Sequence, residues 1–272
     1  MKNILCPVDF SEAALEGMEY AAQMARSLGG RLTLIHIVPS IWPEAVHMEG
    51  EVLGAEESIS NKLDFLKEKI VAEFNINCDW HLAHTVETIE QAIGEKASSY
   101  DLIVMGTNGA DDSYQYAFGS NTYHVISETK CPLLIVPEGC QYANIQKIVY
   151  VFDPEMNPVY LADQLGEAAA AFPSKVIVLH VLTDVVSEET DRQLEILQST
   201  LKARDSAGFQ WGFEREFSAD PANALDQVLS DNEPSLLTLS FHHRTLVERL
   251  FEKDMVKALS GVARHPLLVI HR

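Results

Sequence analysis

Glycine and hydroxyl residues in the first half of the chain have the spacing of a loop that holds phosphate. The pattern is Gly106-x2-Gly109-x9-Gly119-Ser120. Because glycine has no Cβ, it reaches positive φ easily and lets backbone N–H groups approach an anion closely. We predict a helix from Ser120 to Lys130, whose N-terminal N–H groups and positive dipole end would add to the attraction. The pattern therefore indicates an anion or nucleotide site.

The chain consists of two copies of one unit. Residues 4–9 recur at 148–153, at a spacing of 144, and residues 132–136 recur at 266–270, at a spacing of 134. The change in spacing means that ten residues are missing from the middle of the second copy. A repeat of this length indicates two related domains.

The second copy lacks the glycines of the loop. The four positions of the pattern are occupied there by Ser240, His243, Lys253 and Asp254. Side chains at these positions would fill phosphate space, so we predict one nucleotide per chain. A zinc site formed by His242, His243 and Asp254 is an alternative use of this region, because imidazole and carboxylate suit that metal. Adjacent histidines in an extended segment point in opposite directions, and we therefore predict no metal site.

Composition excludes several classes of partner. The chain has 40 acidic and 20 basic residues, giving a formal charge of −20, which opposes binding to nucleic acid or to anionic lipid. It has no apolar run of about 20 residues and no signal-peptide pattern at its start, so we expect a soluble, cytoplasmic protein without membrane association. The cysteines are scattered, which favours buried free thiols: Cys6, Cys78, Cys131 and Cys140.

Short apolar runs alternate with helical patterns along each copy. In the first copy the runs are 4–8, 32–38, 102–105 and 133–136. Consecutive Ile, Val and Leu residues are typical of parallel strands that are covered on both faces. We predict an α/β fold of two tandem doubly wound domains, each a five-stranded parallel sheet in the order 3-2-1-4-5 with helices on both faces. The domains are placed at residues 1–138 and 146–272, joined by a polar connection.

The first copy contains three helical patterns and one long loop. We predict a helix from Ala14 to Leu28, with Ser11 as N-cap and Gly29 as the stop signal. Two further helices are expected at about residues 59–74 and 86–97. Residues 39–57, which include Trp42, Pro43 and Gly54, are predicted to form a loop over the ligand edge.

The chain resembles the universal stress protein family in its tandem-domain form, over nearly its whole length. The resemblance is carried by Pro7-Val8-Asp9-Phe10-Ser11, by Leu34-Ile35-His36-Ile37-Val38, and by the glycine pattern followed by Cys131-Pro132-Leu133. It implies a stress-response protein that binds ATP, with AMP and ADP as alternatives, and Mg accompanying the nucleotide.

The resemblance also implies residue roles. Asp9 would contact the nucleoside, the backbone of Ile37 would bind adenine, and the loop would hold ribose and phosphates. The loop residues in question are Gly106, Gly109, Gly119, Ser120 and the backbone of Asn121. Neighbouring residues that complete the predicted nucleotide site are Pro7, Val8, Met105, Asn108 and Thr122.

The loop differs from the family pattern in its charge. The family often has a basic residue after the second glycine, whereas Asp111 and Asp112 stand close behind Gly109 here. Two carboxylates beside a triphosphate repel it unless a divalent cation bridges them. The alternative, that both carboxylates point into solvent, stays open.

Catalytic chemistry has little support in the sequence. His36 and His180 occupy the same repeat position at the ends of buried strands, where we expect hydrogen-bonded structural histidines. We predict no catalytic residue and at most slow ATP hydrolysis. A slow hydrolase or autophosphorylating enzyme that uses Ser120 or His124, and a scaffold without nucleotide, remain as alternatives.

The partners follow from the same pattern. The apolar last strands, 133–136 and 267–270, would be exposed sheet edges unless they pair with each other, so we predict that the two domains pair through them. A homodimer of whole chains and an unidentified protein partner are further expectations.

Overall fold

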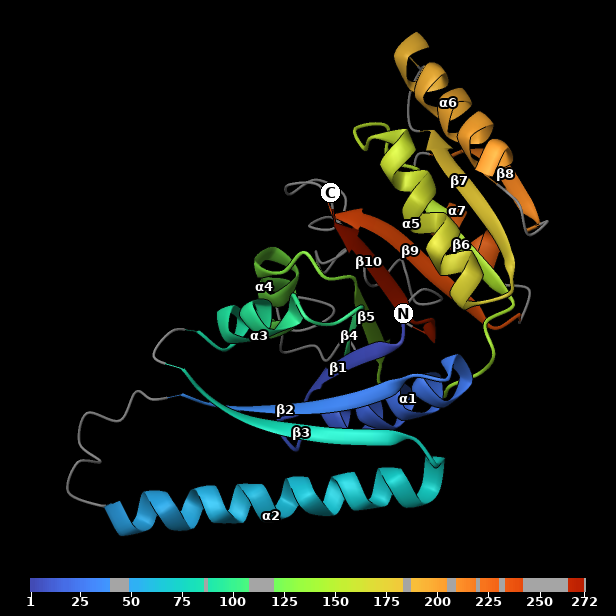
Figure 1. The fold of residues 1–272 in the computed structure, drawn as a ribbon. Coiled ribbons are helices and arrows are strands. Elements are labelled where there is room, and N and C mark those ends of the chain that lie inside the picture. Colours follow the sequence, from blue (N-terminus) through green and yellow to red (C-terminus); the bar gives the residue numbers. More distant parts are fainter. Residues whose placement is uncertain are drawn as a thin grey trace.

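The computed structural model of this protein describes residues 1–39, 49–85, 88–107, 120–182, 187–204, 209–218, 221–229, 233–241 and 264–271. The strands in these ranges form one ten-stranded sheet in the order β3-β2-β1-β4-β5-β10-β9-β6-β7-β8 (Figure 1). Each half of the chain therefore contributes strands in the order 3-2-1-4-5, as predicted.

The elements of the first half alternate between strand and helix. Its strands are β1 (Asn3–Pro7), β2 (Arg31–Pro39), β3 (Asn77–Thr85), β4 (Leu102–Thr107) and β5 (Leu133–Pro137). Its helices are α1 (Glu12–Leu28), α2 (Glu49–Phe74), α3 (Ile89–Ala97) and α4 (Ser120–Glu128). All strand pairs within this half are parallel.

The second half repeats this arrangement in its described residues. Its strands are β6 (Lys147–Val151), β7 (Lys175–Leu182), β8 (Trp211–Phe217), β9 (Ser235–Phe241) and β10 (Leu267–His271). Its described helices are α5 (Pro158–Ala171), α6 (Glu188–Arg204) and α7 (Pro221–Leu229).

Helices cover both faces of the sheet, because successive strand residues point to opposite sides. On one face, Ile4 and Cys6 pack in a core with residues of α1, α2, α5 and α6. On the other face, Leu5 packs in a second core with residues of α3, α4 and α7. Both cores run from one half of the chain into the other, so the halves share their apolar interior.

The two halves join where β10 pairs with β5. The pairing is antiparallel, with Leu268 opposite Leu134 and Val269 opposite Leu133. The predicted pairing of the last strands is therefore confirmed. It removes two apolar edges at the centre of the molecule and leaves β3 and β8 as the outer edges of the sheet.

The ends of α1 form as predicted. The Ser11 hydroxyl accepts a hydrogen bond from the N–H of Ala14 at 3.3 Å, and Gly29 has φ of 60°, the left-handed conformation that ends helices. The prediction for the long loop was partly wrong, because α2 already begins at Glu49. Gly54 suggested a loop, but it lies on this helix, exposed and with open space at its Cβ position.

The difference in length between the copies lies mainly in one helix. α2 has 26 residues and α6, its counterpart, has 17. The missing residues of the second copy thus shorten an outer helix and leave the strand order unchanged.

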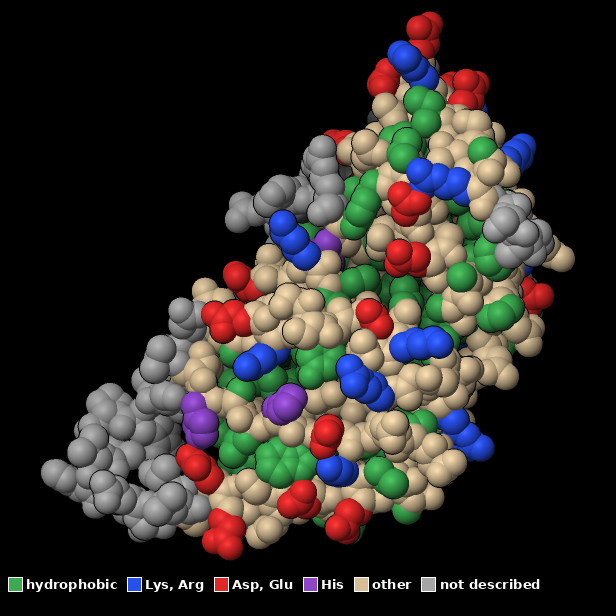
Figure 2. All heavy atoms as spheres, in the orientation of Figure 1, with side chains coloured by type: hydrophobic (Ala, Val, Ile, Leu, Met, Phe, Trp, Pro, Cys, Tyr) green, Lys and Arg blue, Asp and Glu red, His purple; other side chains and the backbone are tan. Residues whose placement is uncertain are grey.

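The surface shown in Figure 2 carries charges of both signs. Lys and Arg side chains are scattered among Asp and Glu on this face, without a continuous basic patch over the described residues. None of the helices in the described ranges has the length and apolar character needed to cross a bilayer.

Candidate functional site

The carboxyl end of β1 forms a tight turn into α1. The Asp9 Oδ1 atom accepts hydrogen bonds from the N–H of Ser11 at 2.9 Å and from its hydroxyl at 2.6 Å. Phe10, between them, has φ of 67°, a left-handed conformation that is uncommon for a bulky residue. The Asp9 side chain is exposed. The turn therefore holds a carboxylate in a defined position at the edge of the sheet.

The end of β2 is hydrogen-bonded to the residue before this turn. The N–H of Val8 donates to the Ile35 carbonyl at 2.9 Å, and His36 Nδ1 lies 2.7 Å from the Val8 carbonyl oxygen. Because a carbonyl accepts, His36 must carry its proton on Nδ1. The expectation of a hydrogen-bonded structural histidine is met at this position. It fixes the backbone of Ile37, the predicted adenine contact, close to Asp9.

The end of β4 approaches α1 more closely than side chains would allow. A Cβ on Gly106 would lie 1.8 Å from the Ala13 carbonyl oxygen, and a Cβ on Gly17 would lie 2.3 Å from the Gly106 nitrogen. Both neighbours are backbone, which cannot swing aside. Helix packing by itself therefore requires glycine at Gly106, apart from any ligand. The close contact also brings the start of the glycine loop beside the Asp9 turn.

The helix after the loop begins at Ser120, as predicted, and ends at Glu128. Thr122 is buried, with 4% of its surface exposed, and Val125 and Ile126 are fully buried in the core. Asn108, Gly109 and Gly119, together with Asp111 and Asp112, lie outside the described residues.

The structure thus gathers part of the predicted site. Pro7, Val8 and Asp9 from the β1 end, Ile37 from β2, and Met105 and Gly106 from β4 lie on three adjacent strands, at their carboxyl ends. In open α/β sheets this edge is where ligands bind, next to the point at which strand order reverses. Val8 and Ile37 are buried, with 3% and 8% of their surface exposed.

The second half has a similar carboxylate hydrogen bond after β6, but its β9 has a side chain where β4 has Gly106. Asp153 Oδ1 accepts from the N–H of Glu155 at 3.0 Å, as Asp9 Oδ1 accepts from that of Ser11, but the residue between is Pro154 and lacks the left-handed conformation of Phe10. At the counterpart of Gly106 stands Ser240, whose hydroxyl is 2.7 Å from the hydroxyl of buried Tyr150. A carboxylate that accepts from the N–H two residues later is therefore not by itself a mark of a ligand site, because it also occurs after β6 in the second half. Sequence comparison of the copies could not have found the Tyr150 to Ser240 contact.

His180, the counterpart of His36, is held differently. Its ring packs edge-on against Phe152 at 5.2 Å between centroids, and its Nδ1 has no hydrogen-bond partner among the described residues. Burial lowers the pKa of His180, and Arg215 nearby lowers it further. The histidine is buried as expected, but the predicted hydrogen bond is not made by Nδ1.

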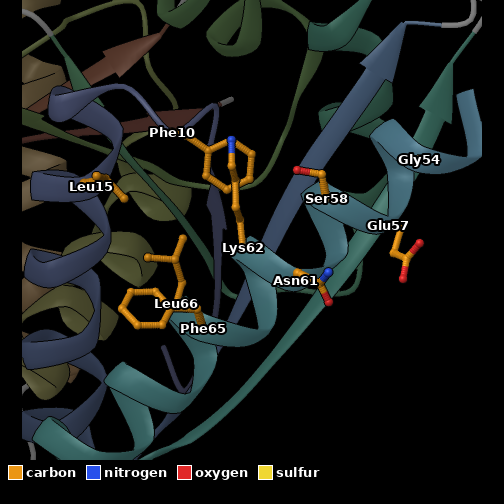
Figure 3. A pocket seen from close by; sticks show the side chains of 9 residues that line it. All are labelled: Phe10, Leu15, Gly54, Glu57, Ser58, Asn61, Lys62, Phe65 and Leu66. Carbon is orange, nitrogen blue, oxygen red and sulfur yellow. The ribbon is translucent and has the colours of Figure 1, made fainter. Parts of the chain in front are cut away.

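A cavity of about 530 Å³ lies between α1 and α2, beside the Asp9 turn (Figure 3). Phe10 forms one wall. The centre of its ring lies 4.7 Å from that of His36 and 5.2 Å from the Lys62 ammonium. Phe65, exposed for 67% of its surface, lines the opening. None of the predicted nucleotide-binding residues in the described ranges lines this cavity. It therefore adjoins the described part of the candidate site through Phe10 and shares no predicted residue with that part.

The described thiols offer no nucleophile. Burial raises the pKa of Cys131 to about 12 and that of Cys140 to about 11, and it raises the pKa of Cys6 further. A thiol is a nucleophile only as the thiolate, so these groups are unreactive near neutral pH. Among the described residues, no His, Cys, Asp and Glu side chains cluster in a way that could hold a metal. His242, His243 and Asp254 lie outside the described residues.

Comparisons with known proteins agree on one family. The model of the universal stress protein family matches residues 1–137. Universal stress protein Slr1230 of Synechocystis is 23% identical over 273 aligned residues, covering 92% of this chain and 93% of that protein. Universal stress protein MJ0531 of Methanocaldococcus jannaschii is 31% identical over 145 residues, covering 50% of this chain and 81% of that protein.

A solved structure has the same architecture over the full length. A universal stress protein from Archaeoglobus fulgidus superimposes with a TM-score of 0.73, covering 99% of this chain and 98% of that one at 16% identity. The likeness at this identity concerns the fold.

Proposed function

The chain belongs to the universal stress protein family, and we propose that its first domain, residues 1–138, binds one adenine nucleotide at the carboxyl edge of its sheet. ATP is the expected ligand, with AMP and ADP as alternatives. The second domain, residues 146–272, does not bind nucleotide and serves to pair with the first domain or to contact a partner protein. The whole acts as a regulatory protein in a stress response.

The observation that carries this proposal is the meeting of three strand ends around the Asp9 turn. The Asp9 carboxylate, the backbone after His36 and the close contact of Gly106 with α1 lie on adjacent strands. The glycine pattern leads along the sequence from this point to the start of α4, where the first N–H groups have no acceptor within the helix and so favour an anion. A carboxylate for ribose hydroxyls, a backbone edge for adenine and a helix start for phosphates are what an adenine nucleotide requires.

The second domain differs at the positions where α1 approaches β4 in the first domain. The counterpart of Gly106 is Ser240, which is engaged with Tyr150, and the counterpart of Gly17 is Leu161, which is fully buried. Helix α5 therefore cannot make the backbone approach that α1 makes to β4. These differences support a single site per chain.

Isothermal titration calorimetry of the full chain with ATP and Mg tests the proposal. We expect one site, and we expect Gly119→Arg to abolish it, because an arginine side chain would occupy phosphate space. Lys253→Ala, which removes the side chain from the corresponding position of the second domain, is the matched control and should leave the stoichiometry at one. A stoichiometry near two, or unchanged binding by the Gly119→Arg protein, would contradict the proposal.

Multiple-turnover phosphate release separates a binding module from an enzyme. The described part of the site contains no general base with a hydrogen-bonding arrangement suited to activating water. We therefore expect phosphate release at the background rate. Steady release that disappears in the Gly119→Arg protein would identify a slow hydrolase instead.

A further inference from the structure

One side chain of the second half reaches the helix that follows the glycine loop in the first half. His271, in the last strand β10, places Nε2 2.9 Å from the carbonyl oxygen of Ile126 in α4. The residue is 6% exposed, and its ring packs against Phe241 at 5.7 Å between centroids. Because a carbonyl only accepts, Nε2 carries the proton and donates. The contact is therefore a directed hydrogen bond between the two halves.

The hydrogen bond supplies a partner for a carbonyl near the C-terminal end of α4. The last carbonyls of a helix have no partner within it, and here the Val125 carbonyl accepts from the N–H of Thr129 while the Ile126 carbonyl accepts from His271. The last turn of α4 contains no basic residue of its own. With nine residues, α4 is too short to be stable alone and depends on tertiary contacts.

The contact is not repeated in the opposite direction. Thr107 pairs with Pro137 in the first half as Phe241 pairs with His271 in the second, so Pro137 is the counterpart of His271. A proline side chain has no donor. Only the second half can therefore cap a helix of the other half at this position.

We propose that His271 is a positioning residue for the nucleotide site of the other half. By holding the C-terminal end of α4, it fixes the helix whose N-terminal end receives the phosphate loop. The second half would thus determine the geometry of a site to which it contributes no contact. The effect on nucleotide rests on the proposed function, whereas the effect on α4 does not.

Hydrogen exchange of the ligand-free full chain tests the effect on α4. His271→Leu removes the donor and keeps an apolar side chain, and we expect faster exchange in peptides covering residues 120–128 and unchanged exchange in α1. His180→Leu is the matched control, because His180 is equally buried in a strand of the same half without such a contact. We expect His180→Leu to leave α4 unchanged and His271→Gln, which retains an N–H donor, to restore protection. Unchanged α4 exchange in the His271→Leu protein, or equal acceleration in both Leu variants, would overturn the proposal.

The nucleotide measurement uses the same variants with ATP and Mg. Loss of one net hydrogen bond corresponds to a change on the order of fivefold, so we expect the Kd for ATP to rise by about that factor in the His271→Leu protein. The Kd for adenosine should change much less, because adenosine does not reach the start of α4. Unchanged ATP affinity with accelerated exchange would overturn the link to the nucleotide site. If the wild-type chain binds no ATP, the proposed function fails, and the exchange measurement still decides whether His271 holds α4.

Discussion

The close contact between α1 and β4 predicts that alanine in place of Gly17 lowers the stability of the protein. Alanine in place of Gly166, which has no such contact, should raise the stability. An alanine at Gly17 would put its Cβ 2.3 Å from the nitrogen and 2.6 Å from the Cα of Gly106. Ordinary contacts between such atoms are about 3.5 Å, so α1 and β4 would have to separate by about 1 Å. Overpacking costs roughly 1–3 kcal/mol, and here only backbone can yield, which favours the upper end. Alanine regains about 1 kcal/mol of helix propensity, leaving a net loss of about 2 kcal/mol.

Gly166 on α5 is the control. A Cβ there meets nothing within 4 Å. Gly166→Ala should therefore stabilise the protein by up to about 1 kcal/mol, because only the propensity and the unfolded-state entropy change. Thermal denaturation followed by circular dichroism measures both effects. For a chain of this size we expect the Tm to fall by about 4–8 °C for Gly17→Ala and to rise by about 2–4 °C for Gly166→Ala.

The same pair reports on the candidate site. Separation of α1 from β4 moves the Asp9 turn away from the start of the glycine loop, so Gly17→Ala should also weaken ATP binding while Gly166→Ala does not. A Tm for the Gly17→Ala protein at or above the wild-type value would refute the reasoning, because it would mean that α1 and β4 do not pack backbone to backbone. Lowered stability with unchanged ATP affinity would refute the connection between this packing and the site.

Two further predictions concern cations and pH. Chelation of the cation by EDTA should weaken ATP binding far more than adenosine binding. Replacing Asp111 and Asp112 with Asn should reduce this dependence, because the charge of the two carboxylates adds to that of the phosphates. An ATP affinity, measured by calorimetry, that is equal with and without EDTA would show that these carboxylates face solvent. Burial lowers the pKa of His180 and His271 below the ordinary value of about 6.5, so the unfolded chain binds more protons below that pH. The stability that these neutral histidines contribute should be complete above about pH 6.5 and decline as the pH falls through their lowered values. Thermal denaturation across this range should show a shallower decline when both are replaced by Gln, and an unchanged slope would contradict the assignment.

Much of the architecture could be predicted from the sequence. Consecutive apolar residues in runs such as 32–38 predict strands covered on both faces. The repeat at a spacing of 144 residues predicts the corresponding strands in the second copy. The pairing of β5 with β10 also followed, because two apolar last strands must be covered. Asp9 and Ile37 could be placed together, since parallel strands end at one edge of the sheet. These features depend on periodicity along the chain and on the rules by which strands are connected and covered, and they need no knowledge of individual side-chain contacts.

The start of α2 was the main error in the secondary structure. Glycine is a weak helix former, so Gly54 favours the loop that the sequence predicts for residues 39–57. In the structure the helix runs from Glu49, eight residues before the end of the predicted loop at Glu57. Propensity is a weak signal that tertiary context overrides.

The sequence by itself therefore determined the fold class, the two copies, their joint and the edge at which the predicted site lies. Only the tertiary structure decided why Gly17 and Gly106 must both be glycine and that His271 caps a helix of the other half. In both cases the partners are far apart in the chain, and at least one of them makes the contact through backbone atoms. Backbone carbonyls and nitrogens are nearly the same at every position. The pattern of side chains along the sequence therefore cannot predict which backbone atoms will be in contact.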